Sequence, residues 1–422
     1  MSSNKSWCWV PSLYFTEGLP YFAAMVISVT MYKRMGIDNA QIALYTGWLY
    51  LPWVIKPFWS PIVDMFSTRR AWIVATQIIM GAAFASIAFL IPVSDFFRWT
   101  LCLFWLVAFS SATHDIAADG FYMLGLSEEQ QAFYSGIRST AYRIATIFGQ
   151  GILIYIAGEL EEHLGSNSGA WSIIFGILAF MMIALGLFHR HILPKPQRDI
   201  TRSMTSIASG IKDFTRIFVT FFRKPGIVSA LLFMLLFRLP EAQLVKMLTP
   251  FLLDGKEAGG LALSTAEIGI IYGTIGAIGL ILGGIVGGIC IAIKGLKYWL
   301  WPMVLAISIP NLVYVYLSFA QPDSLLLISG CILVEQFGYG FGFTAYMLYL
   351  IYFAQGEYPT AHYAIATAFM ALGMMLPGMV SGCIQEAVGY DMFFIWVMIC
   401  CIATFVVSGL LKIDPKFGKK IK

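Results

Sequence analysis

Ten ionisable side chains stand within long apolar stretches of this sequence, five acidic and five basic. Charge in such surroundings costs several kcal/mol unless it is paired or faces a polar cavity. The pattern predicts an internal polar network, which either moves protons and anions or only holds helices together. The acids are Glu17, Asp115, Asp119, Glu241 and Glu335, and the bases are Lys56, Arg138, Arg143, Arg238 and Lys246.

Asp115 and Asp119 are four residues apart, so a helix places both carboxylates on one face. Repulsion between them favours a proton on one of them, which is chemistry that can couple movement to protons. Two interpretations remain open for Asp115: proton coupling, or a fixed ion pair with Arg138 or Arg143 on the next apolar stretch. His114, beside the pair, is a candidate substrate contact.

The other charges are more scattered. Glu17 and Glu335 have no charged residue within four positions, which favours a functional role. Arg238 and Glu241 have the spacing of an ion pair on one helix. Lys246 and Gln336 are candidate substrate contacts, whereas Lys56 is expected to snorkel to a membrane surface.

The elements that carry these residues are predicted to cross a lipid bilayer. Apolar residue types make up 59% of the 422 residues and charged types only 12%, about half the usual share in soluble proteins. We predict twelve transmembrane helices, each long enough for a hydrocarbon core of about 30 Å. The predicted spans are 7–31, 41–63, 71–93, 99–125, 132–157, 170–189, 226–252, 265–293, 297–318, 324–352, 362–385 and 391–411. The first is too long for the apolar region of a cleaved signal peptide.

Basic residues between the spans predict the orientation. They are concentrated in the loop between the second and third spans, at Arg69 and Arg70, in the segment 189–224 and in the tail after residue 411. We therefore expect both termini in the cytoplasm. The seven cysteines form no paired motif, so we expect no disulfide framework, no metal site and no cofactor.

The polar segment 189–224 separates six predicted spans from six. Leu19-Pro20 and Leu239-Pro240 match weakly across it, as do Tyr122-Met123-Leu124 and Tyr346-Met347-Leu348, in the same order in both halves. This is the 6+6 plan of major facilitator transporters, which bind substrate near the midplane. We predict bundles at 1–190 and 225–422, joined by a linker at 191–224.

Asp64, Arg69 and Arg70 resemble a shortened form of the gating motif of major facilitator proteins. A plain pair at a helix end is the alternative. The glycine-rich stretch around Gly279, Gly283 and Gly287 predicts close helix packing.

Several motifs together resemble the AmpG family of muropeptide permeases, a branch of the major facilitator superfamily. They are Thr16-Glu17-Gly18-Leu19-Pro20; Lys56-Pro57-Phe58-Trp59-Ser60-Pro61; His114-Asp115-Ile116-Ala117-Ala118-Asp119-Gly120; Tyr142-Arg143; Phe237-Arg238-Leu239-Pro240-Glu241; and Glu335-Gln336. His114, Pro240-Glu241 and Gln336 depart from the family's usual residues, which bears on the substrate and not on the fold.

The resemblance implies proton-driven import of anhydro-muropeptides from periplasm to cytoplasm across a bacterial inner membrane. We expect Asp119, Glu335, Asp115, Glu241 and Glu17 to couple protons, and Arg138, Arg143, Arg238, His114, Gln336 and Lys246 to contact substrate. The rival interpretation is a permease for another amino-sugar disaccharide or glycan fragment. A membrane enzyme is disfavoured, because the long loop 189–224 has only Asp199 and Asp213 as acids. The expected partners are a sugar or muropeptide, protons and lipid, with no nucleic acid and a monomeric state.

Overall fold

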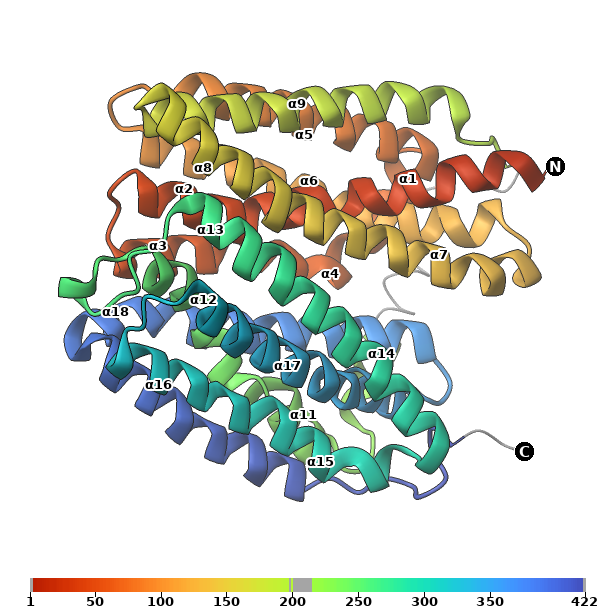
Figure 1. The fold of residues 1–422 in the computed structure, drawn as a ribbon. Coiled ribbons are helices and arrows are strands. Elements are labelled where there is room, and N and C mark those ends of the chain that lie inside the picture. The colour runs from red at the N-terminus through yellow and green to blue at the C-terminus, as the bar shows by residue number, and fades with distance from the viewer. Residues whose placement is uncertain (1–2, 197–198, 200–214, 420–422) are drawn as a thin grey trace. The chain divides into compact units, whose positions relative to one another are not determined.

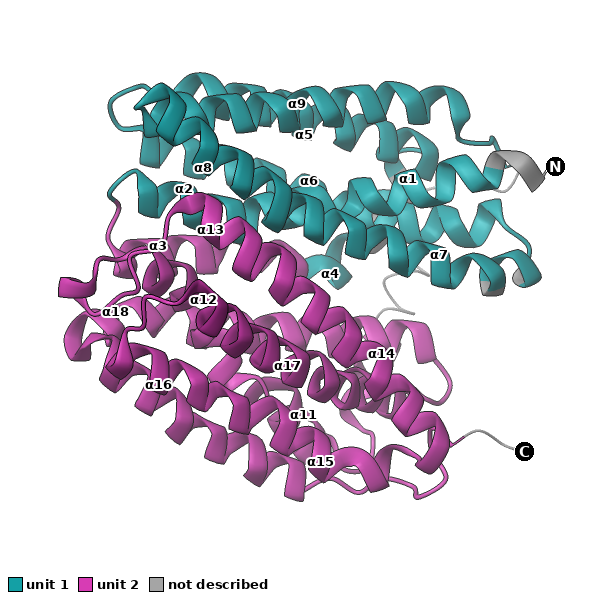
Figure 2. Ribbon diagram, in the orientation of Figure 1, with its two compact units in different colours: residues 1–36, 55–212 teal, residues 37–54, 213–422 magenta. Residues whose placement is uncertain are grey.

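The computed structural model describes residues 3–196, 199 and 215–419, without the side chains of residues 3–5, 60–62, 64, 65, 128 and 132. The described residues contain helices and no strands, which confirms the predicted all-α class. The chain forms two compact units, residues 1–36 with 55–212 and residues 37–54 with 213–422. Figure 2 colours the units separately.

Unit 1 is built from long helices, two of which continue through a short π-helical stretch. Its elements are α1 (Ser3–Phe22), η1 (Ala23–Ile27), α2 (Ser28–Arg34), most of α4 (Leu51–Phe66), α5 (Arg69–Leu90), α6 (Phe96–Gly125), α7 (Glu128–Thr146), η2 (Ile147–Ile152), α8 (Leu153–Leu164) and α9 (Asn167–Ile192). α5 packs against α6 and α9, and α1 packs against α7 (Figure 1).

Local sequence explains where these helices begin and how closely they approach. Thr68 begins α5, because its hydroxyl accepts a hydrogen bond from the backbone N–H of Ala71. Ser127 and Gln130 form a capping box at the start of α7. A methyl group at Gly18 would lie 2.8 Å from Cβ of Ala145, so the glycine permits the close contact of α1 with α7. That contact brings α1 and its Glu17 against the neighbouring helices.

Unit 2 contains the remaining helices. They are α3 (Asn39–Trp48), the first turn of α4, a helical segment at 215–222, α11 (Ile227–Leu236), α12 (Leu239–Leu253), η3 (Lys256–Ala258), α13 (Thr265–Ile270), η4 (Ile271–Gly276), α14 (Ala277–Lys294), α15 (Leu296–Ser308), η5 (Ile309–Asn311), α16 (Leu312–Ala320), α17 (Leu325–Ala354) and α18 (Pro359–Gly409). α18 is two helical stretches, because the backbone of Gly389 leaves the helical region with φ 79° and ψ 170°. α3 packs on α18.

The predicted glycine-mediated packing lies between α14 and α17. A methyl group at Gly283 would lie 2.0 Å from the carbonyl oxygen of Phe337, and one at Gly340 would lie 2.1 Å from that of Leu280. Only glycine fits such a backbone approach. The same face continues at Gly279 and Gly287, whereas Gly288 has open space around it.

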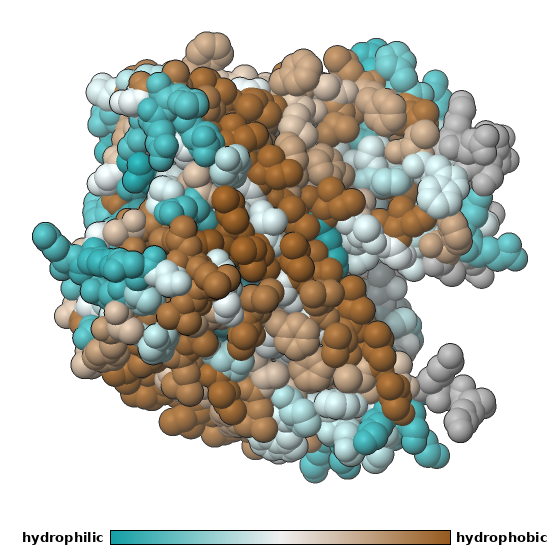
Figure 3. Space-filling model, in the orientation of Figure 1, coloured by the Kyte–Doolittle hydropathy of each residue, from teal (hydrophilic) through white to brown (hydrophobic). Residues whose placement is uncertain are grey.

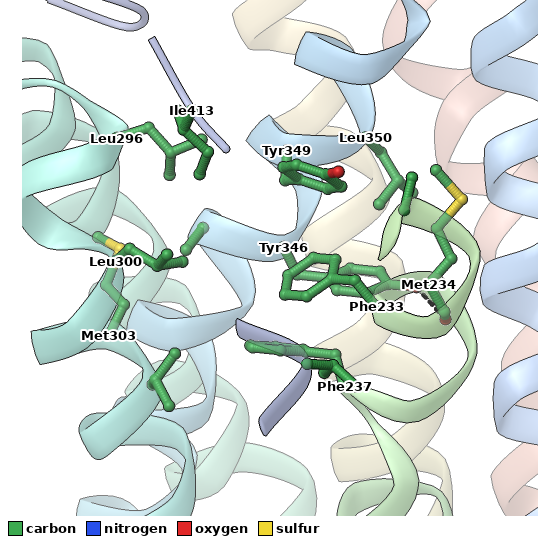
Figure 4. Close-up of a cluster of buried hydrophobic side chains, with 14 of the residues drawn as sticks. Phe233, Met234, Phe237, Leu296, Leu300, Met303, Tyr346, Tyr349, Leu350 and Ile413 are labelled. Carbon is green, nitrogen blue, oxygen red and sulfur yellow. Dashed lines mark hydrogen bonds between the residues drawn. The ribbon is translucent and has the colours of Figure 1, made fainter. Parts of the chain in front are cut away.

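An aromatic cluster fixes the end of α11, just before Arg238. The ring of Tyr346 stacks on Phe233 at 5.4 Å and on Phe237 at 5.2 Å between ring centroids. Its hydroxyl donates a hydrogen bond of 2.7 Å to the carbonyl oxygen of Met234, drawn in Figure 4. Pro240 lacks a backbone N–H, so the helix is interrupted at Arg238 and resumes as α12. The core therefore holds Arg238 at a helix break.

The exposed face of α14 is apolar, as a lipid-facing surface must be. On α14, Leu282, Ile285, Ile289 and Ile293 are between 49% and 62% exposed. Figure 3 shows apolar side chains along this helix. Nine helices among the described residues are long and apolar enough to cross a membrane, and α18 counts once among them. The fold of a multi-pass membrane protein is thus confirmed, while the count of twelve spans stays a prediction.

Candidate functional site

Five of the predicted charged residues meet within unit 1. Glu17 comes from α1, Lys56 from α4, Asp115 and Asp119 from α6, and Arg138 from α7. One carboxylate oxygen from each of the three acids lies within 4.8 Å of the others. Residues that are far apart in sequence thus form one ionic cluster.

Each aspartate of this cluster has its own cation. Lys56 forms an ion pair with Asp115. Nη2 of Arg138 lies 2.8 Å from Oδ1 of Asp119. The hydroxyl of Tyr14 donates a hydrogen bond of 3.2 Å to the same oxygen, and the guanidinium of Arg138 lies 4.3 Å from the centre of the Tyr14 ring. Tyr14 therefore holds both members of the second ion pair.

These contacts correct two of the sequence expectations. Lys56 does not extend to a membrane surface. Its ammonium group instead pairs with the carboxylate of Asp115, and this half-buried ion pair compensates both charges. Asp115 pairs with this lysine and not with Arg138 or Arg143. Arg143 is half-buried on α7 and makes no ion pair with any acid whose side chain is described.

Among the described side chains, none forms an ion pair with Glu17. Its Oε2 is buried without a hydrogen-bond partner, and one of its carboxyl oxygens lies within 4.8 Å of a carboxyl oxygen of Asp115. Two ionised carboxylates at this distance repel each other, which favours a proton on one of them. Three acids against two bases also leave one negative charge in excess. The cluster is therefore suited to bind one proton.

His114 faces a different neighbourhood from Asp115, the next residue. Its Nε2 lies 2.8 Å from Nε2 of Gln77, and Oε1 of Gln77 lies 2.9 Å from Nδ1 of His189. Nε2 of His189 in turn lies 2.9 Å from the hydroxyl of Ser12. This buried chain joins α6, α5, α9 and α1. The described contacts of His114 are thus with the bundle core and not with the ionic cluster.

Four further predicted residues are buried in unit 2, and none of them forms an ion pair among the described side chains. Glu335 is 1% exposed; its Oε2 accepts hydrogen bonds from the Tyr314 hydroxyl at 2.6 Å and from Nε2 of Gln336 at 2.9 Å. Oε1 of Glu335 has no partner. Glu241 is 2% exposed, and neither of its carboxyl oxygens has a partner.

The two buried cations of unit 2, Arg238 and Lys246, also have neutral partners. Nη2 of Arg238 donates to the hydroxyl of Tyr339, and the guanidinium lies 4.8 Å from the centre of the Phe343 ring. The predicted Arg238–Glu241 ion pair is absent here, because the helix break at Arg238 disrupts the regular spacing on which it depended. Nζ of Lys246 donates a hydrogen bond of 2.8 Å to the hydroxyl of Thr46.

The candidate gating residues lie at the start of α5. The side chain of Asp64 lies outside the part of the chain that the structure describes. The backbone N–H groups of Arg69 and Arg70 donate hydrogen bonds of 2.8 and 3.1 Å to the carboxylate of Asp199. A carboxylate at a helix N-terminus is stabilised by the free N–H groups there. The guanidinium of Arg69 lies against Gly120 on α6, where a methyl group would be 1.9 Å from Nη1.

Sequence reasoning missed the uncharged partners. Tyr14, Tyr314 and Thr46 each form a hydrogen bond with one of the charged residues. Only Tyr14 could have been suspected from the sequence, because it lies three positions before Glu17 and so on the same face of one helix. Tyr314 lies on α16 and Glu335 on the next helix, α17, 21 positions further along the chain, so nothing in the sequence linked them.

The comparisons with known proteins agree with this fold. A family model described as Major Facilitator Superfamily matches residues 12–382, and the chain belongs to that superfamily. It is thus a multi-pass membrane transporter of the major facilitator type.

The sequence is similar to transporters of one branch. It is 26% identical to a putative transporter AmpG 4 of Rickettsia conorii, over 94% of each chain. It is 25% identical to the anhydromuropeptide permease of Escherichia coli K12, over 91% of this chain and 75% of that protein. The predicted resemblance to AmpG proteins is therefore confirmed.

The fold is also found in solved structures. A D-xylose–proton symporter superposes with a TM-score of 0.74 at 12% identity, over the full length of both chains. A bacterial homologue of the human lysosomal transporter Spinster gives a TM-score of 0.70 at 16% identity, over 97% of each chain. These likenesses establish the fold alone.

Proposed function

We propose that this chain is a proton-coupled secondary transporter that imports anhydro-muropeptides by alternating access. The substrate would be N-acetylglucosaminyl-anhydro-muramic acid, with or without peptide, moved from periplasm to cytoplasm. The observation that supports proton coupling is the closeness of Glu17 to Asp115 inside a cluster of three acids and two bases. A group of this kind binds and releases a proton with little rearrangement.

The proposed proton-coupling residues are Asp119, Glu335, Asp115, Glu241 and Glu17. Glu335 and Glu241 are included because each is almost fully buried with at least one unpartnered carboxyl oxygen. A carboxyl group in that position is stabilised by a bound proton or by a cationic partner in another conformation.

The muropeptide assignment is supported by the similarity to the Escherichia coli permease and by cationic side chains suited to an anionic sugar. The proposed substrate contacts are Arg138, Arg143, Arg238, His114, Gln336 and Lys246. Asp64, Arg69 and Arg70 are the proposed gating residues, and we propose that Asp199 holds their helix end in this conformation.

We place the protein in a bacterial inner membrane with both termini in the cytoplasm, as a monomer without enzymatic activity. The support for this orientation is the concentration of Lys and Arg in one set of loops. Six-helix bundles at 1–190 and 225–422 with a linker at 191–224 complete the proposal.

Uptake of radiolabelled anhydro-muropeptide into proteoliposomes tests the function. An inward proton gradient is expected to stimulate uptake by the wild-type protein, and Asp119→Asn and Glu335→Gln are expected to abolish that stimulation. If both variants kept full dependence on the gradient, the proton-coupling assignment would be wrong.

A permease for another amino-sugar disaccharide or glycan fragment is the second candidate. It is favoured by the departures from the family pattern at His114, Pro240-Glu241 and Gln336, the last of which contacts Glu335. Competition separates the candidates. A plain disaccharide that inhibits muropeptide uptake as strongly as unlabelled muropeptide would favour the glycan fragment.

A further inference from the structure

The buried charges of unit 2 differ from those of unit 1 in their partners. In unit 1 the cations Lys56 and Arg138 each contact a carboxylate. In the described part of unit 2, the ion pairs are Arg216–Glu357 and Lys256–Asp323, and in each at least one partner is well exposed. Among the described side chains, the direct polar and ring contacts of the buried cations Arg238 and Lys246 are with hydroxyl groups and aromatic rings.

The ammonium group of Lys246 can donate more hydrogen bonds than it makes to the described residues. An ammonium group has three N–H donors, and among the described residues Lys246 donates one hydrogen bond, to the Thr46 hydroxyl. The side chain is 3% exposed, and its Nζ lies 5.5 Å from the centre of the Tyr50 ring. Gly378 makes room for the stem, because a methyl group there would lie 3.3 Å from Cγ of Lys246. The lysine is therefore held in place by packing and forms no ion pair with any acid whose side chain is described.

Arg238 has the same deficit. Its Nε is buried without an acceptor, while Nη2 is bound to the Tyr339 hydroxyl. Glu241 interacts with Arg238 electrostatically but makes no hydrogen bond to it. Lys246 follows Arg238 by about two helical turns along α12, and its Nζ lies 5.5 Å from the centre of the Tyr50 ring, which also interacts electrostatically with Arg238.

We propose that Arg238, Tyr50, Lys246 and Thr46 form a subsite for a carboxylate of the transported substrate. A carboxylate offers two oxygens, which matches an arginine fork together with a nearby ammonium group. An uncharged sugar would leave both cations without a counter-ion in a buried place. This inference rests on the proposed transport function and narrows it to acidic sugars or acidic glycopeptides. Tyr50 and Thr46 become substrate-site residues.

The test is binding of three ligands to the detergent-solubilised full-length protein. The first is peptide-free N-acetylglucosaminyl-anhydro-N-acetylmuramic acid, which has a free lactyl carboxylate. The second is the same disaccharide with that group converted to a carboxamide. The third carries a stem peptide, so its carboxylates belong to the peptide.

Lys246→Met and Arg238→Gln are expected to weaken binding of the free acid at least tenfold and to leave carboxamide binding unchanged. Lys297→Met, an exposed lysine at the start of α15, is the matched control and should change neither. Unchanged carboxamide binding also shows that the variants are folded. If Arg238→Gln does not fold, Lys246→Met alone decides. The peptide-bearing ligand identifies the source of the carboxylate, because it loses affinity in the variants only if peptide carboxylates use the subsite.

The outcomes separate this inference from the muropeptide assignment. Equal losses for acid and carboxamide, or equal wild-type affinity for both, would overturn the subsite while transport stands. If the wild type bound a disaccharide of glucuronic acid and no muropeptide, and Lys246→Met removed that binding, the subsite would stand and the muropeptide assignment would fall. Binding of neutral sugars only, or of none of these ligands, would count against the subsite.

Discussion

Tyr314 and Glu335 are joined by a hydrogen bond of 2.6 Å, in which the phenol donates to Oε2 of the carboxyl group. Nε2 of Gln336 donates to the same oxygen, and Oε1 has no partner. The two donors fix one oxygen and leave the other available. Tyr314, on α16, is therefore a positioning residue for the acid on α17.

We expect Tyr314→Phe to reduce proton-driven uptake about tenfold, because a hydrogen bond to a charged group contributes about 1.5–3 kcal/mol. The pH dependence of uptake should also change, which a purely structural loss would not cause. Tyr316→Phe is the control, since Tyr316 is on the same helix and 49% exposed. Uptake at several external pH values measures both. An unchanged pH profile in Tyr314→Phe would show that the phenol does not act through Glu335.

The ion pair of Lys56 with Asp115 should appear as coupling in a double-mutant cycle. Lys56→Met and Asp115→Asn each leave one charge without its partner, and we expect each to lower the stability of unit 1 by about 1–3 kcal/mol. The estimate is below the value for a fully buried pair, because the side chains are 27% and 19% exposed. The double variant should be more stable than the sum of the single losses predicts. Thermal unfolding in detergent gives the four values, and strict additivity would argue against the pair.

Glu17→Gln removes the excess negative charge of the unit 1 cluster. We expect this variant to bind substrate with nearly wild-type affinity but to lose accumulation driven by a proton gradient. The reason is that a side-chain amide does not bind and release a proton as a carboxyl group does. Counterflow, which needs no gradient, should persist. Glu162→Gln, an exposed acid on α8, is the control. Gradient-driven accumulation at the wild-type level in Glu17→Gln would remove Glu17 from the coupling residues.

The contact of α14 with α17 predicts a position-specific effect of one methyl group. Gly283→Ala should lower stability by about 1–3 kcal/mol, because the added carbon meets a backbone carbonyl that cannot rotate away. Gly288→Ala, five residues along the same helix and with open space around it, should be neutral or slightly stabilising. Thermal unfolding of the two variants in detergent tests the difference. Equal effects would show that helix propensity and not packing governs this helix.

The apolar stretches predicted helices and membrane insertion well, because in lipid the backbone must satisfy its hydrogen bonds within each segment. The spacing of Asp115 and Asp119 on α6 also predicted a shared face correctly. Boundaries were less predictable. Residues 39–66, predicted to hold one span at 41–63, contain two helices, α3 and α4. The break of α18 at Gly389, in contrast, falls between the predicted spans 362–385 and 391–411.

The sequence did not predict which charged side chains pair between helices. The sequence offered Arg138 and Arg143 as partners of Asp115, but the tertiary structure brings Lys56 of α4 to it instead. Arg238 and Glu241 had ideal helical spacing, but the break before Pro240 separated them. Such choices depend on helix rotation and distance, which hydropathy does not encode.

The sequence by itself determined that the chain is an all-helical membrane protein, that charges are placed inside it, and that it resembles muropeptide permeases, because composition and local motifs carry that information. The tertiary structure decided which charges meet. It brought Glu17 close to Asp115 and left Arg238 and Lys246 with neutral partners, since electrostatic compensation at a few ångströms depends on how helices pack.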